Sequence, residues 1–157
     1  MSDIVSPRIA EDFTVSLRVR HPSIDPGEIT RALGLEPQHS WKAGDARRTA
    51  QGQRLEGAYH ETYWTGEFSE HTMGLLGVMT TEAVLLQVAV QLRRSQQFLS
   101  RLQKEGATIE LFVEVFGGNE FTFSLSPQLL SMLARCGVSV ALQVHGDSQT
   151  AVQRKVG

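Results

Sequence analysis

The sequence predicts an α+β domain in which a mostly antiparallel sheet of about five strands carries helices on one face. Segments in which apolar and polar residues alternate recur along the chain, and segments of helical periodicity separate them. Prolines and glycines stand where those helices begin and end. The 157 residues suffice for one domain. We place it at residues 12–146, between a flexible leader at 1–11 and a flexible tail at 147–157.

The first strand and the first helix carry the clearest signals. In "FTVSLRVRH", residues 13–21, apolar side chains alternate with polar ones, as in a strand with one buried face. The next segment predicts a helix at 26–33, with Asp25 as its N-cap and Gly34 as its left-handed stop. Glu28 is expected to complete a capping box with Asp25.

The middle of the chain is less regular. Residues 38–58 indicate a long polar loop, and "AYHETYWTGEF" at 58–68 predicts a strand. Residues 66–80 show no clear period. Helical periodicity covers 81–105. Either one long helix accounts for it, or two helices with a break at Arg93-Arg94-Ser95 and Ser95 as the N-cap of the second.

The C-terminal part predicts a hairpin, a helix and a last strand. "TIELFVEVF" at 108–116 and "EFTFSLS" at 120–126 are expected to pair through the turn "GGN". The last strand is "VSVALQVH" at 138–145. "FTVSL" and "FTFSL" each precede a helix that starts with proline. This similarity is explained either by two related βα halves or by coincidence. The residues of the last strand expected to point inward are Val138, Val140, Leu142 and Val144.

Composition limits the function classes. The net charge is −2, so any attraction to nucleic acid or to a membrane must be local. A single cysteine, Cys136, excludes an intramolecular disulfide. The N-terminal segment lacks the apolar core of a signal peptide, and polar residues interrupt every long apolar run. We therefore expect a cytoplasmic protein with neither a nucleic-acid nor a membrane partner.

No catalytic constellation is recognisable in the sequence. The histidines at 21, 39, 60, 71 and 145 lack the spacing of a metal site, and there is neither a nucleophile elbow nor a phosphate-binding loop. Cys136 closes an apolar helix, which is typical of a small buried hydrophobe. The sequence thus predicts a non-enzyme without cofactor or metal.

The stretch "WKAGDARRTAQGQR" at 41–54 has four basic side chains and one aspartate. Three interpretations apply. Trp41 could anchor the loop to the core while Asp45 bonds backbone amides. The loop could be a docking surface, since Trp, Tyr and Arg dominate interface hot spots. It could also grip phosphates, although no nucleic-acid fold signature accompanies it.

The run "FTVSLRVRHPSIDPGEITRALGLEPQHSWKAGD", followed by "GAYHETYW", resembles the bacterial family known as domain of unknown function 4279. The shared features are the strand ending in Arg-His, the D-P-x-E-I-T helix, the L-G-L-x-P stop, the W-x-x-G-D turn and the aromatic strand ending in Tyr-Trp. "LQKEGATIELFVEVF" and "FSLSPQLLSMLARCGVSVAL" continue the resemblance, which extends over residues 13–145. Some members of that family look like immunity proteins beside secreted toxins. The resemblance therefore implies a non-enzymatic protein that binds and neutralises a cognate toxin.

An uncovered strand edge would also allow a homodimer.

Two sets of site residues follow from these interpretations. The alternative to toxin binding is a small ligand-binding or anion-binding domain, or an enzyme, with its site at the 41–48 loop beside Arg18, Arg20 and His21. The expected partner-binding residues are Trp41, Lys42, Asp45, Arg47, Arg48, Tyr63 and Trp64.

Overall fold

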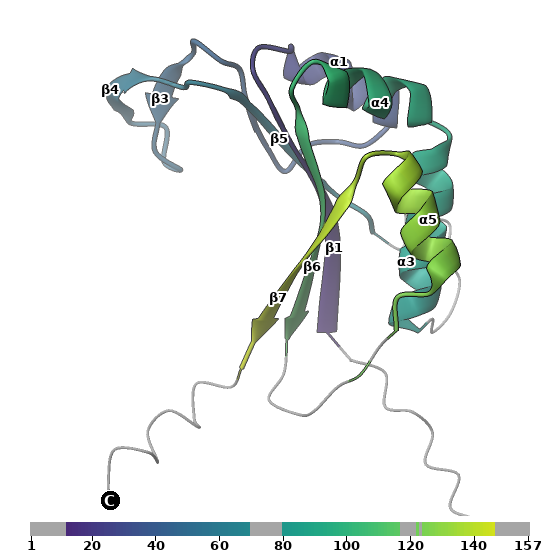
Figure 1. Cartoon of the computed structure of the whole chain (residues 1–157). Helices are drawn as coiled ribbons and strands as arrows, with labels where there is room; N and C mark the ends of the chain where they lie inside the picture. The colour runs from purple at the N-terminus through teal and green to yellow at the C-terminus, as the bar shows by residue number, and fades with distance from the viewer. Residues whose placement is uncertain (1–11, 70–79, 117–121, 123, 147–157) are drawn as a thin grey trace, which may run out of the picture.

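The computed structural model describes residues 12–69, 80–116, 122 and 124–146. It has one five-stranded sheet in the order β2-β5-β1-β6-β7 and a separate two-stranded hairpin, β3-β4. The described helices cover one face of the sheet, and the hairpin projects from the other side (Figure 1). The elements are β1 Asp12–His21, α1 Pro26–Leu33, β2 His39–Trp41, β3 Ala46–Arg48, β4 Arg54–Ala58, β5 Thr62–Glu67, α3 Thr81–Arg93, α4 Gln96–Lys104, β6 Thr108–Phe116, α5 Pro127–Arg135 and β7 Ser139–His145.

The central strand β1 pairs antiparallel with both β5 and β6, which confirms the predicted first strand. Its residue Val19 stands opposite Trp64 on one side and Ile109 on the other, and all three are buried beneath the helices. The next alternate residue, Arg20, faces the uncovered side. One apolar and one polar face therefore run through the three central strands, as the alternation predicts.

The sheet is mixed, which corrects the prediction of a mostly antiparallel sheet. Strand β7 pairs with β6 in parallel, with Leu111 opposite Val140. Residues 122 and 124–126 are not in a strand, so the predicted returning strand at 120–126 is wrong where the structure describes it. The chain comes back through α5 instead, and a helical crossover delivers the next strand in parallel. The turn predicted at 117–119 lies outside the described residues.

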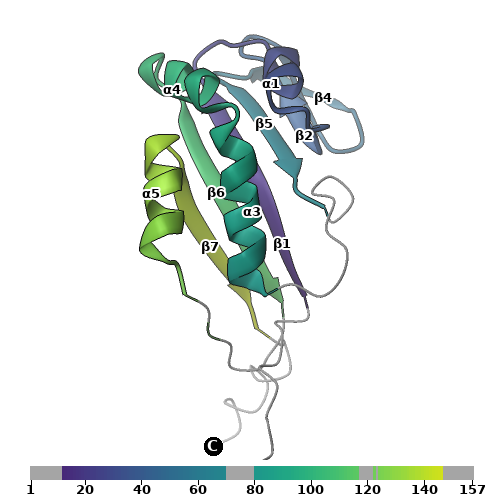
Figure 2. The same ribbon diagram turned by 90° about the vertical axis from the view of Figure 1, so that its right-hand side faces the viewer.

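The helices lie against one face of the sheet (Figure 2), and a cluster of buried, mainly aliphatic side chains forms the core between the two layers. Helices α3 and α5 pack on one another over the central and C-terminal strands, while α1 lies over β5 and α4 over the start of β6. Burial of a leucine side chain contributes about 2 kcal/mol, so this layer is the main source of stability. Fully buried leucines of the core are Leu17, Leu35, Leu85, Leu92, Leu99, Leu102, Leu111, Leu129 and Leu133.

The helices begin and end largely at the predicted residues, with two differences in how the ends are capped. Asp25 accepts a hydrogen bond from Gly27 N–H at 2.8 Å, and Gly34 adopts φ 66°. Glu28 forms an ion pair with Arg101 across to α4, so its predicted capping-box role is replaced by a tertiary contact. Two helices occupy 81–105, and Ser95 at their junction donates to the carbonyl of Ala32 rather than capping α4.

The last strand is buried only at its start. Val138 is buried, whereas Leu142 is 51% and Val144 52% exposed, so the predicted direction of these two is right but they are not buried. Both belong to the face that carries the helices, since Leu142 stands opposite Val113 and Val144 opposite Val115. The described helices do not extend over this end of the edge strand.

Two further points concern the whole fold. In the described part of the chain, no helix is long and apolar enough to span a membrane. "FTVSL" lies in β1, whereas the described residues of "FTFSL" are outside any strand, so the two motifs differ in conformation. That the halves are related stays a prediction.

Candidate functional site

The predicted polar loop at 38–58 contains three short strands, and these build the candidate site. β2 extends the sheet beside β5, and β3 and β4 form a hairpin that projects from the helix-free face (Figure 1). Strands of three to five residues are too short for a clear alternation, which is why the sequence indicated only a loop.

Beneath this hairpin lies an open hollow of about 910 Å³, which we call the cradle. The end of β1, strand β2, the hairpin, the connection at 59–61 and the start of β6 all contribute to its wall. The lining residues that matter for binding are Arg20, Trp41, Arg47, Arg48, Leu55 and Tyr59.

An aromatic stack supports one wall of the cradle. The Trp41 ring stacks on Tyr59 and on Tyr63, each with ring centroids 4.5 Å apart and interplanar angles of 16° and 20°. Trp41 pairs with Tyr63 across β2 and β5, so both rings lie on the sheet face opposite buried Trp64. Of the three interpretations of this loop, the one in which Trp41 anchors it to the core does not hold, because Trp41 packs on the open face of the sheet.

The W-x-x-G-D turn holds the stack in place, and Asp45 acts in it as expected. The Asp45 carboxylate accepts the Lys42 N–H at 3.2 Å, and Asp45 N–H donates to the Lys42 carbonyl at 3.1 Å. Gly44 has φ 89°, a left-handed conformation that favours glycine, and its N–H donates to the Tyr59 carbonyl at 2.8 Å. Lys42 lies 3.7 Å from a carboxylate oxygen of Asp25. Both Lys42 and Asp45 thus have structural partners.

The cradle carries excess positive charge. Its lining includes Arg20, Arg47, Arg48 and one carboxylate, Glu61, which lies 4.0 Å from Arg20. Arg48 donates to the Gly52 carbonyl at 3.1 Å, which fixes its guanidinium within the hairpin. Among the described residues no carboxylate forms an ion pair with Arg47 or Arg48 of β3. These two guanidiniums are therefore available to an anionic partner.

Trp64 was predicted to bind a partner, but its side chain is buried in the core. Its side chain is 0% exposed, and its indole N–H donates to Thr30 Oγ1 at 3.0 Å. A partner could reach it only by opening the core, so Trp64 is a structural residue that joins β5 to α1.

Of the alternative anion set, the structure brings Arg20 and His21 to the cradle but not Arg18. The Arg18 guanidinium lies over the Phe112 ring, 3.5 Å from its centroid, in a cation–π contact on the open face. Arg20 and His21 both line the cradle, but His21 is buried and its ring nitrogens are bonded within the protein. Of the three, Arg20 alone offers its charge to the cradle.

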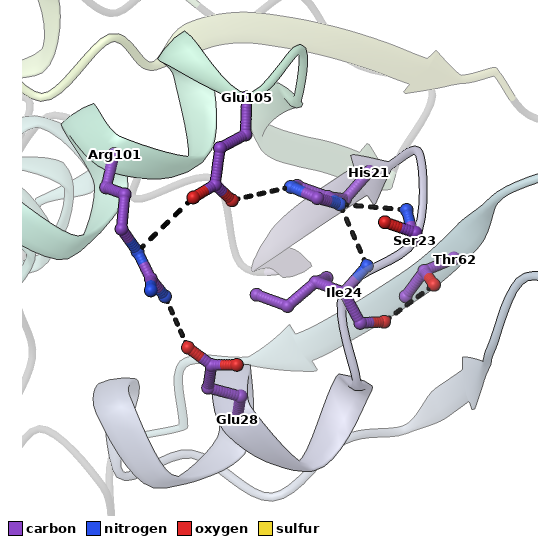
Figure 3. Close-up of polar contacts among 7 residues, drawn as sticks. All are labelled: His21, Ser23, Ile24, Glu28, Thr62, Arg101 and Glu105. Atoms are coloured by element: carbon purple, nitrogen blue, oxygen red, sulfur yellow. Dashed lines mark hydrogen bonds and ion pairs between the residues drawn. The ribbon is translucent and has the colours of Figure 1, made fainter.

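The ring of His21 is occupied by the protein itself (Figure 3). Its Nδ1 accepts the backbone N–H groups of Ser23 and Ile24 at 3.0 and 2.9 Å, so Nδ1 carries no hydrogen. The hydrogen is therefore on Nε2, which donates to Glu105 at 3.0 Å. The other Glu105 oxygen lies 3.8 Å from Arg101 Nε, and Arg101 pairs with Glu28.

This network fixes the back of the cradle, because His21 and the neighbouring Gly106 both line it. The hydrogen bond with Glu28 is the main cause that raises the pKa of the Arg101 guanidinium. The network joins β1, α1 and α4 through groups whose hydrogen bonds are already used (Figure 3). We assign it a structural role.

Other reactive groups lie away from the cradle. Cys136 is 1% exposed, which confirms its interpretation as a buried hydrophobe, and burial raises the pKa of its thiol. Across the described ranges, no three His, Cys, Asp or Glu side chains gather as metal ligands would.

Sequence reasoning missed two of the cradle residues. Leu55 is 40% exposed as the second residue of β4, between Arg54 and Glu56. An isolated leucine in an otherwise polar segment was the available signal. Tyr59 was expected on a strand, yet it lies between β4 and β5, where its hydroxyl exchanges hydrogen bonds with the Arg48 backbone.

Comparison with known proteins gives one match. A family model described as "Domain of unknown function (DUF4279)" matches residues 11–147, which include the whole described sheet and the hairpin. No curated protein and no solved structure matches the chain.

Proposed function

This chain belongs to the DUF4279 family, and from that premise we propose that it is a non-enzymatic binding protein of the immunity type, which neutralises a toxin protein. The partner would be held in the cradle, in the cytoplasm, and binding would cover the surface that the toxin needs for its activity. Membership of the family is the reason to expect an immunity protein, and the charged and apolar lining of the cradle is the reason to place the partner there.

The observation that carries the proposal is the exposed basic hairpin. Every residue of β4 is exposed, and Leu55 projects there as an unburied apolar side chain. Arg47 and Arg48 flank it from β3 without carboxylate partners among the described residues. Arginine and aromatic residues dominate interface hot spots, and an apolar side chain ringed by charge is typical of the centre of a docking surface.

The chemistry of the cradle indicates the kind of surface it takes. The partner would present carboxylates to Arg47 and Arg48 and a shallow apolar depression to Leu55. Complementary charge raises the association rate and fixes the orientation of the complex. A standard interface of about 1,600 Å² would extend beyond the cradle onto the adjoining open face of the sheet.

The test is a pull-down of the tagged full chain with toxin proteins encoded beside it, followed by titration of the bound partner. Arg47→Ala combined with Arg48→Ala is expected to weaken binding at least tenfold, and Leu55→Ala similarly. The matched control is Arg94→Ala, an exposed arginine at the α3–α4 junction, on the helical side of the molecule. Equal affinities for all these variants would remove the hairpin from the interface. Failure to bind any neighbouring toxin would reject the immunity proposal itself.

A second candidate function rests on the same excess charge. A small phosphate-bearing ligand could bind between Arg20 and the hairpin arginines, as the alternative interpretation expects. A thermal-shift series with inorganic phosphate and nucleotides distinguishes the two, because a ligand that binds only the folded state raises the melting temperature by mass action. A rise that disappears in the Arg47→Ala, Arg48→Ala variant favours the small ligand.

A further inference from the structure

Strand β7 forms one edge of the sheet and lacks the usual protection of an edge. Its sequence is "SVALQVH", which has no lysine, arginine, carboxylate or proline. Edge strands in monomers are commonly blunted by charge, proline, a bulge or short length, because their free N–H and C=O groups otherwise pair with another chain. Within the described residues, no strand bonds to the outer side of β7.

The opposite edge shows the contrast. β2 has three residues, so it offers a pairing partner very little backbone. β7 has seven residues in register with β6 from Ser139 to His145. It also carries two aliphatic side chains, Leu142 and Val144, that are about half exposed on the helix-bearing face.

We propose that β7 pairs antiparallel with β7 of a second copy of this chain, about a two-fold axis perpendicular to the sheet. The two five-stranded sheets would then form one continuous sheet, with the helices of both copies on the same side. The proposal is independent of the cradle, because β7 and β2 occupy opposite edges of the sheet.

The pattern of β7 is self-complementary in this arrangement. A perpendicular two-fold axis keeps each face of the strand on the same side in both copies, so apolar residues meet apolar residues. With the axis at Leu142, this residue stands opposite its own copy, and Val140 stands opposite Val144. On the other face Ala141 stands opposite Gln143, and Ser139 opposite His145. No like-charged carboxylates, lysines or arginines are opposed, so nothing on the strand disfavours a second copy.

The apolar contact would also explain why two aliphatic residues near the end of β7 are exposed in the single chain. Leu142 and Val144 lie beyond the reach of the described helices, and pairing would cover both with the same residues of the other copy. An interface built on one strand pair is at the small end of the range for specific association. We therefore expect a reversible dimer whose population rises with concentration in the micromolar range.

Sedimentation velocity of the full chain over a concentration series tests the proposal. The expected result is a shift from the 17.4 kDa chain to a species of twice that mass. Leu142→Lys should abolish the shift, because it places two like charges opposite each other at the axis. Val144→Lys should also weaken the dimer, because it replaces the apolar contact with Val140 of the other copy by a lysine. Both positions are already exposed in the single chain. The matched control is Leu55→Lys, which adds the same charge to an exposed leucine of the hairpin and should leave dimerisation unchanged.

A crosslinking experiment tests the register. In a Cys136→Ala background, Leu142→Cys should form an intermolecular disulfide faster than Ser139→Cys, because the axis passes beside residue 142. A chain that stays monomeric at every concentration overturns the proposal, whether its edge is covered by its own remaining segments or by a different protein. A dimer that persists in both lysine variants, with folding verified by circular dichroism, also overturns it.

Discussion

The imidazole of His21 and the carboxylate of Glu105 meet at 3.0 Å and join the end of β1 to the end of α4, 84 residues away in the chain. Because Nδ1 is already an acceptor for two backbone amides, the donor in this contact is Nε2. One side chain thus satisfies the turn after β1 and holds the helix layer against the wall of the cradle.

Substitution of His21 by alanine should lower the free energy of unfolding by about 2–3 kcal/mol, because it leaves the amides of Ser23 and buried Ile24 without their acceptor. Urea unfolding followed by circular dichroism measures this loss. Glu105→Gln is the matched control, since its amide oxygen can still accept from Nε2, and its cost should stay below about 1 kcal/mol. Equal costs would show that the contact with Glu105, rather than the two amides, is what His21 supplies.

The two tryptophans should differ sharply in their contribution to stability. Trp64→Ala opens a cavity in the core and removes the partner of Thr30, so we expect a loss of about 3–5 kcal/mol. Trp41→Ala removes two stacking contacts on the open face, each worth about 0.5–1.5 kcal/mol beyond its buried area, and the protein should remain folded. Urea midpoints compare the two. If Trp41→Ala unfolds the chain, the assignment of Trp41 to the cradle wall is incorrect.

Gly66→Ala should destabilise the protein although alanine is usually tolerated in a strand. A Cβ at Gly66 would lie 2.5 Å from the Cη2 atom of Trp64, whose indole occupies this position. Overpacking of this kind costs about 1–3 kcal/mol. A double-mutant cycle with Trp64→Phe checks the cause, because the smaller ring leaves room for the methyl group. Additive costs would place the strain elsewhere.

The stability contributed by the neutral Cys136 thiol should be lost at alkaline pH. Burial raises the pKa of this thiol in the folded protein above that in the unfolded chain. The contribution is therefore complete below about pH 8.5, the ordinary pKa of cysteine, and declines as the pH rises above it. Unfolding free energies of the wild type and Cys136→Ala should thus diverge less at pH 10 than at pH 7. A pH-independent difference would show that the folded thiol ionises normally.

Most of the helical layer could be predicted from the sequence, because its signals are local. Asp25 and Gly34 mark the ends of α1, and the alternation of β1 defines its buried face. Pairing direction is not local, so the sequence could not show that β7 runs parallel to β6. The exposure of Leu142 and Val144 could not be predicted for a related reason: alternation predicts which side of a strand is apolar, not whether a helix extends over it.

The location of the candidate site was predicted better than its architecture. The 41–48 stretch does line the cradle through Trp41 and the two arginines, as an unusual mixture of aromatic and basic residues suggested. Adjacent residues of β5 then separate in role, since Tyr63 joins the aromatic stack and Trp64 enters the core. The alternation of a strand imposes that separation once the chain pairs with β1.

The contrast between Trp41 and Trp64 gives the protein two intrinsic fluorophores with different sensitivities. They are the only tryptophans in the chain, and one stacks on tyrosines in the cradle while the other is sealed beneath α1. Emission from Trp64 should change only when the core opens, whereas quenching of Trp41 should follow occupancy of the cradle. With Trp64→Phe and Trp41→Phe as single-fluorophore variants, the same titration separates binding from unfolding without an added label.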